Sequence, residues 1–153
     1  MKKQQSGFTM IELIMVIVIL GILAAFALPR FVNLGADARL ATLQGAFGSV
    51  KSASALTHAA WLAKGDPTNT SIDAEGGSIT MIATSGYPAA ASIASAAGIS
   101  SDDFDIDTTA TTGAAIISPD GVADASKCNV TYTQPAATAN AVPTIVIADD
   151  DCN

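Results

Sequence analysis

The chain opens with an apolar run that carries an acid at its head. From Leu13 to Leu28 no side chain is charged or forms a hydrogen bond, yet Glu12 stands immediately before this run. A segment that is apolar on every side predicts a helix that is buried all round or lies in lipid. An acid in such a segment is costly unless it has a partner and a function. Glu12 is therefore the first candidate functional residue.

A second, amphipathic pattern follows Pro29 and runs to Lys64. Its apolar positions are spaced by three and four: Leu40, Leu43, Phe47 and Val50. This spacing places them on one face of a helix. The breakers Gly65-Asp66-Pro67 then end the pattern. We predict one long helix from Phe8 to Lys64, whose part 30–64 belongs to a globular head.

The remaining part, 65–153, is rich in turns and short apolar stretches. We predict a short helix over 89–99, and the turn Pro119-Asp120-Gly121 favours a hairpin. Four stretches rich in β-branched residues predict strands: 78–84, 114–118, 130–133 and 144–148. Together these patterns predict an α+β fold, a long helix packed on a small antiparallel sheet.

Composition narrows the class of protein. Half of the residues are hydrophobic and 14% are charged, which excludes a highly charged, disordered chain. The formal net charge is −7, and Lys127 is the sole base from Gly65 onward. An acidic distal half argues against a nucleic-acid partner, because phosphates require a basic surface.

The two cysteines, Cys128 and Cys152, allow two interpretations. An even pair in a chain with an export-like start favours one disulfide formed in an oxidising compartment, and the alternative is two free thiols. A disulfide would close a loop of the chain and stabilise the folded state by about 3–4 kcal/mol. A cysteine metal site is poorly supported, because the single histidine, His58, lies far upstream.

Two ordinary readings of the N-terminus leave Glu12 unexplained. A secretory signal would use Lys2 and Lys3 before the apolar run and Ala25-Phe26-Ala27 as its cleavage site, releasing a soluble protein. A permanent transmembrane helix would use the same lysines to fix its orientation. Neither reading gives a carboxylate in the apolar segment a role.

A third reading rests on the run KKQQSG followed by FTMIELIMVIVILGILAAFALPRF. This run resembles the N-terminus of type IV pilins and of the related pseudopilins of secretion systems. The resemblance implies that residues 1–7 are a leader, which a prepilin peptidase cuts between Gly7 and Phe8. It also implies N-methylation of Phe8. Residues 8–29 are then a transmembrane helix before assembly and the filament core afterwards.

The same resemblance assigns roles within the helix. Glu12 matches the family's glutamate, which is paired with the new amino terminus of a neighbouring subunit during assembly. Physical reasoning agrees, because a buried ion pair fixes register and breaking it leaves an uncompensated charge. Gly21 and Pro29 match the family's helix glycine and proline. Both disfavour regular helix, so we expect them to make this segment flexible.

The function that the resemblance implies is structural. After Pro29 the sequence is most similar to MSHA-type (mannose-sensitive haemagglutinin) pilins, which form attachment filaments. The expected partners are further copies of the chain in a helical filament, the inner membrane before assembly, prepilin peptidase, the pilus assembly machinery and minor pilins. The expected final location is the bacterial cell surface. The alternatives are a pseudopilin in a periplasmic piston and a soluble secreted binding protein.

Other signals do not change this interpretation. His58 and Trp61 stand three apart and predict an aromatic packing pair. The acidic stretch SDDFDID predicts a solvated loop rather than a calcium site, because Thr108 replaces the EF-hand glycine and Ala114 replaces the closing acid. No nucleophile, base and acid can be combined into a catalytic set. We therefore expect no enzyme activity, no cofactor and no metal.

Overall fold

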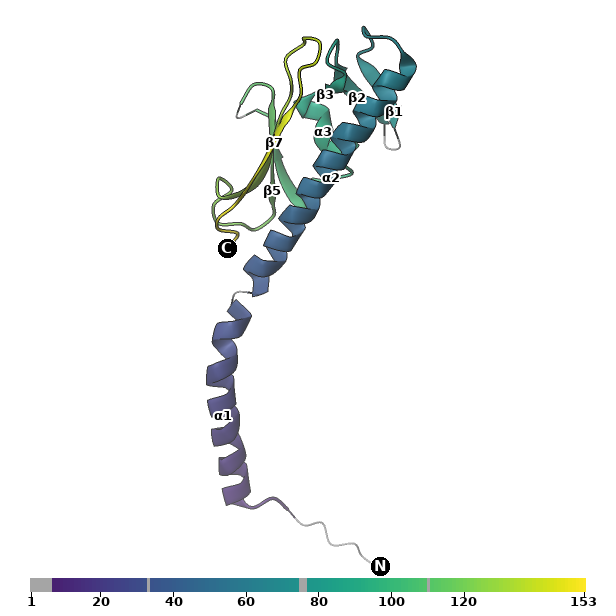
Figure 1. The fold of residues 1–153 in the computed structure, drawn as a ribbon. Helices are drawn as coiled ribbons and strands as arrows, with labels where there is room; N and C mark the ends of the chain where they lie inside the picture. Colours follow the sequence, from purple (N-terminus) through teal and green to yellow (C-terminus); the bar gives the residue numbers. More distant parts are fainter. Residues whose placement is uncertain (1–6, 33, 75–76, 110) are drawn as a thin grey trace, which may run out of the picture. The chain divides into compact units, whose positions relative to one another are not determined.

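The computed structural model describes residues 7–32, 34–74, 77–109 and 111–153, with the backbone alone over 27–32. The chain divides into two compact units, Met1–Gly35 and Ala36–Asn153, which are described separately. Of the predicted leader, residues 1–6 lie outside the described part of the chain. Figure 1 shows the course of the chain within each unit.

Helix α1, Met10–Val32, is the first element, and Gly21 and Pro29 both lie within its bounds. It begins two residues after Phe8, and residues 7–9 have no regular structure. The single helix predicted from Phe8 to Lys64 is described as two elements, with Asn33 outside the described residues. No helix in the described ranges combines the length and apolar character that crossing a membrane requires, so the expected transmembrane helix is not seen.

Helix α2, Leu34–Lys64, supplies the main helical face of the core. Leu43 and Val50 are fully buried, and Leu40 and Phe47 pack against the same cluster, which confirms the predicted stripe. Gly65 follows the last helical residue with φ +68°. A glycine takes this left-handed conformation readily at the end of a helix, as the breaker pattern predicted.

The strands form two antiparallel sheets rather than the one predicted. The first has three strands: β1 (Ser71–Ala74), β2 (Gly77–Ile82) and β3 (Tyr87–Pro88). The second has four strands: β4 (Phe104–Asp107), β5 (Ala114–Pro119), β6 (Cys128–Thr133) and β7 (Thr144–Asp149). Pro88 lacks a backbone donor and ends β3, and helix α3 (Ala90–Ala96) follows before the second sheet begins. The short helix is confirmed.

The acidic stretch predicted as a loop contains an edge strand instead. Its residues Phe104 to Asp107 form β4, which pairs with β5. The alternation of apolar and acidic residues explains the difference, because successive side chains of a strand point to opposite faces. Phe104 and Ile106 pack against the core, while Asp105 and Asp107 take the other face. The prediction of a loop considered the charge of the acidic residues and did not consider this alternation.

Two buried clusters hold the head together. The larger one joins α2 and α3 to the four-stranded sheet and includes Tyr132, Ile93 and Ile117. The smaller one joins Trp61 near the end of α2 to β1 and β2. Cys128 and Cys152 form a disulfide buried in the larger cluster, so the two-thiol alternative is excluded. The long helix packed on antiparallel sheets confirms the predicted α+β fold.

Candidate processing and assembly site

The peptide bond between Gly7 and Phe8 lies in an open part of the chain. Residues 7–9 have no regular structure, and the Phe8 side chain is 90% exposed. A Cβ added at Gly7 would meet no heavy atom within 4 Å. The fold of the described chain therefore does not shield this bond from another protein.

Thr9 and Glu12 close the first turn of α1 with reciprocal hydrogen bonds. The Thr9 backbone N–H donates to Glu12 Oε2 at 2.8 Å, and the Glu12 backbone N–H donates to Thr9 Oγ1 at 3.3 Å. The Thr9 hydroxyl also donates to Glu12 Oε2 at 2.7 Å. This is a capping box, which satisfies donors that a helix start otherwise leaves free.

The capping box gives Glu12 a role that the sequence interpretation missed. The signal was present, because Thr9-Met10-Ile11-Glu12 has the capping-box spacing before an apolar run. The box also holds the carboxylate beside the Phe8–Thr9 peptide group. A cut before Phe8 would turn the Gly7–Phe8 amide into a free amino group on Phe8. Phe8 is the residue before Thr9, whose backbone N–H the Glu12 carboxylate already binds.

Helix α1 presents its apolar side chains to solvent. The large apolar side chains from Met10 to Phe26 are all exposed, and Leu20, for example, is 58% exposed. Monomeric proteins seldom expose so long an apolar surface, and such surfaces usually mark contacts with other proteins or with lipid. The described part of this unit has no second element to cover it.

The predicted aromatic pair in the head is confirmed and has a third member. The His58 and Trp61 rings stack with centroids 6.2 Å apart, and Tyr87 stacks on His58 at 4.0 Å. The contact between His58 Nδ1 and the Gly86 carbonyl oxygen is 2.8 Å, and Trp61 Nε1 donates to the Asn69 carbonyl at 2.8 Å. These bonds serve packing. Tyr87 was missed because it belongs to a strand of only two residues.

The acidic residues do not converge on a common point. Across the described ranges, no group of three or more His, Cys, Asp or Glu side chains is placed to hold a metal ion. Asp66 and Asp124 instead accept bonds from their own turns. The hydroxyl and backbone N–H of Thr68 lower the pKa of Asp66, and those of Ser126 lower the pKa of Asp124.

Comparison with known proteins identifies the N-terminal segment. Residues 2–28 match the family described as the prokaryotic N-terminal methylation motif. The chain is 49% identical over 75 residues to the type IV narrow pilus major component PilA5 of Thermus thermophilus, which covers 48% of this chain and 63% of the relative. It is 42% identical over 53 residues to the type IV major fimbrial protein FimA of Dichelobacter nodosus, covering 35% and 34%.

A further relative is a secretion component. The type II secretion system core protein G of Pseudomonas aeruginosa is 40% identical over 52 residues, covering 34% of this chain and 37% of the relative. The chain thus matches less than two thirds of the length of each of these relatives. No solved structure matches it. The resemblance to type IV pilins is confirmed, the MSHA-type subclass is not, and the relatives named here are filament or secretion components rather than enzymes.

Proposed function

We propose that the chain is the precursor of a structural subunit that polymerises into a type IV pilus on the cell surface. The main support is the N-terminal methylation motif joined to an α1 whose apolar side chains are exposed. Burial of apolar area is the dominant driving force in most protein association. Packing α1 against other copies of itself would provide that burial.

The proposed processing is a cut between Gly7 and Phe8 by a prepilin peptidase, followed by N-methylation of Phe8. Mass analysis of the mature N-terminus tests it directly. A terminus at methylated Phe8 supports the proposal. A terminus at Leu28 would instead support the secreted binding protein, because an ordinary signal peptide would be removed there.

Gly7 variants test the cleavage site itself. Gly7→Leu is expected to accumulate as uncut precursor, seen as a larger band on a gel, because a bulky side chain would occupy the residue that precedes the cut. Gly21→Leu adds the same side chain within α1 and is the control. Normal cutting of the Gly7 variant would refute the proposed site.

We further propose that Glu12 sets the register of the filament by pairing with the amino terminus of Phe8 in a neighbouring subunit. Apolar contacts are non-directional, so they do not by themselves fix how far one helix slides along another. A buried ion pair does, because an unpaired buried charge costs about 3–5 kcal/mol. Gly21 and Pro29 would give α1 the local flexibility that close packing requires.

Two substitutions separate the charge of Glu12 from its capping role. Glu12→Gln keeps a side chain that accepts bonds from Thr9, because Gln serves the capping box as Glu does. Glu12→Ala removes both the cap and the charge. Both variants are expected to be cut normally and to give low yields of sheared filament. Full assembly of Glu12→Gln would show that Glu12 acts through the cap alone.

The second candidate function is a pseudopilin, which the similarity to the secretion core protein favours. Electron microscopy of fibres sheared from cells separates the two. Long surface fibres composed of this chain support the pilus. The piston is supported if the cells form no such fibres and if deletion of the chain impairs their protein secretion. Attachment of such cells to surfaces, lost on deletion of the chain, tests the MSHA-like role.

A further inference from the structure

A hollow of about 460 Å³ lies where the last turns of α2, the start of β3 and the connection between β6 and β7 come together. Helix α2 contributes His58 and Trp61, β3 contributes Tyr87, and the connection contributes residues 139–142. Figure 1 shows this connection, in yellow-green, beside β3 at one end of the head. Residues far apart in the chain therefore form one cavity within the head.

The lining of this hollow is largely aromatic and aliphatic. Trp61 is buried, whereas His58 and Tyr87 are only partly buried, so the stacked pair of rings keeps some exposed surface. Leu62 and Val142, which also line the hollow, are 58% and 68% exposed. Ligand sites typically have such a lining, with a few polar groups among apolar and aromatic side chains. The lining therefore favours a ligand that has an apolar face.

Two residues of the hollow have a strained backbone. Thr84 has φ +73° and Asn140 has φ +64°, and within the described residues no other residue except glycine has a positive φ. A β-branched residue rarely adopts this conformation, although asparagine tolerates it better. Such strain persists only where the surrounding structure fixes it, and it is concentrated at active and ligand-binding sites. The two residues belong to separate loops, so their meeting at one hollow independently indicates a binding site.

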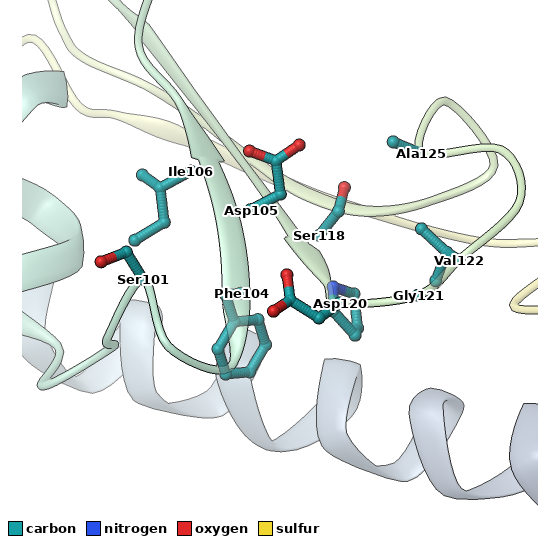
Figure 2. A pocket seen from close by; sticks show the side chains of 10 residues that line it. Ser101, Phe104, Asp105, Ile106, Ser118, Asp120, Gly121, Val122 and Ala125 are labelled. Carbon is teal, nitrogen blue, oxygen red and sulfur yellow. The ribbon is translucent and has the colours of Figure 1, made fainter.

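The charge of the lining indicates that the ligand is neutral. No Asp, Glu, Lys or Arg is among the described residues that line this hollow. A charged ligand would lose hydration there without gaining an opposite charge, which costs free energy. The hollow beside the four-stranded sheet is different, because Figure 2 shows the carboxylates of Asp105 and Asp120 at its wall. The aromatic hollow has no such charge.

Polar groups at the aromatic hollow can exchange hydrogen bonds with hydroxyls of a ligand. The side chains of Thr84 and Asn140 are exposed, and an asparagine amide both donates and accepts. His58 Nδ1 donates to the Gly86 carbonyl oxygen, which leaves Nε2 of the neutral imidazole as an acceptor. The hollow thus combines donors and acceptors with an apolar surface.

We propose that this hollow binds one ring of a neutral sugar. A sugar ring has an apolar face of C–H groups and hydroxyls around its edge, and the hollow offers a partner to each. The C–H face packs against the aromatic and aliphatic lining, while Asn140 and Thr84 bond the hydroxyls. The inference goes beyond the proposed filament and does not depend on it, because the whole site lies within one head.

The fluorescence of Trp61 tests the binding, because Trp61 is the single tryptophan of the chain and lines the hollow. The full chain, in a detergent without a sugar head group, is titrated with the methyl glycosides of glucose, galactose and N-acetylglucosamine. At least one should change the emission saturably, with half-saturation at about 1–10 mM, as a ligand of about twelve non-hydrogen atoms can reach. Saturation-transfer NMR should show transfer from the protein to the C–H protons of the same glycoside.

Two variants test whether the hollow is the site. Asn140→Gly removes the amide and keeps the positive φ without strain, and it should raise the half-saturation concentration about fivefold. Leu62→Ala should raise it about threefold, the effect of losing roughly 25 Å² of apolar contact. Leu56→Ala is the matched control, because Leu56 is an equally exposed leucine of α2 that does not line the hollow. It should bind as the unmodified chain does.

Cyclohexanol is the control ligand, because it has a ring of similar size and a single hydroxyl. If it binds as tightly as every glycoside, the hollow does not recognise sugar hydroxyls and the inference is overturned. It is also overturned if no glycoside gives a saturable signal in either measurement, or if Asn140→Gly and Leu62→Ala both bind fully. Absence of filaments would refute the proposed function and leave this result unchanged, because the titration uses the unassembled chain.

Discussion

The two helices of this chain use their apolar residues in opposite ways. In α1 the large apolar side chains from Met10 to Phe26 are exposed, and this helix belongs to a different compact unit from the head. In α2 the apolar face is buried against α3 and the four-stranded sheet. The first helix has an apolar surface without a partner in the described chain, and the second has its partner in the same head.

This difference separates stability from assembly. Substitutions in the head should change its free energy of unfolding, because its core is complete within one chain. Substitutions in α1 should leave that free energy unchanged and act on the proposed filament. Pairs of identical substitutions, one in each unit, can test the separation.

Leucine-to-alanine changes should show the largest contrast. Leu43→Ala removes a fully buried side chain and is expected to lower the free energy of unfolding of the head by about 4 kcal/mol. Leu20→Ala, at an exposed position of α1, should change it by less than about 0.5 kcal/mol and reduce filament yield instead. Denaturant unfolding of the full chain in detergent measures both. An equal loss of stability in the two variants would refute the separation.

Loss of the disulfide should have the next largest effect. Replacing Cys128 and Cys152 together by alanine is expected to destabilise the head by about 3 kcal/mol, because the unfolded chain regains the freedom of the closed loop. Reduction of the unmodified chain should lower the unfolding midpoint similarly without deleting any side chain. If reduction has no effect, the disulfide does not stabilise the head.

A matched pair of glycines should give effects of opposite sign. Gly86 has φ +70°, and a Cβ there would stand 2.2 Å from an atom of the Trp61 ring, so Gly86→Ala should cost about 2 kcal/mol. Gly21→Ala meets open space and should favour helix by about 1 kcal/mol. Circular dichroism melting of each variant measures these changes. A stabilised Gly86→Ala head would contradict the packing described here.

Tyr132→Phe should have a small effect at neutral pH and a distinctive one in alkali. The buried hydroxyl donates to the Pro88 carbonyl at 2.8 Å, so its removal should cost about 1 kcal/mol. Burial raises the pKa of Tyr132, against the opposing hydrogen bond with Ser54. Its contribution to stability is therefore complete below the unfolded pKa of about 10 and is lost as the pH rises through the folded pKa. The variant should lack this alkaline loss in pH-dependent unfolding, and an unchanged profile would contradict it.

Local patterns predicted the elements that are long or strongly periodic. The stripe on α2, the breaker at Gly65 and the strands at 114–119, 128–133 and 144–149 were all expected within a few residues. Each has a period or a β-branched run that a sequence alone displays. The cysteine pair was predicted as a disulfide because an even pair in an exported chain favours one.

Short elements and pairings depended on non-local contacts. Strand β3 is two residues long, and its place is decided by pairing with β2 rather than by its own composition. Strand β4 alternates apolar and acidic residues, but its acids were interpreted as possible metal ligands and then as a solvated loop, not as part of a strand. The pairing of Asp105 with Ser118 was not predictable, because these residues become neighbours only through the β4–β5 register.

The sequence by itself determined the match to the N-terminal methylation motif, the unbroken apolar run of α1 and the amphipathic face of α2, because each depends on residues that are close together in the chain. The tertiary structure decided how the head is divided into two sheets, where the acidic strand β4 pairs, and which aromatic rings stack near the end of α2. These properties depend on residues far apart in the chain, whose distances are set only when strands pair and side chains close a common core.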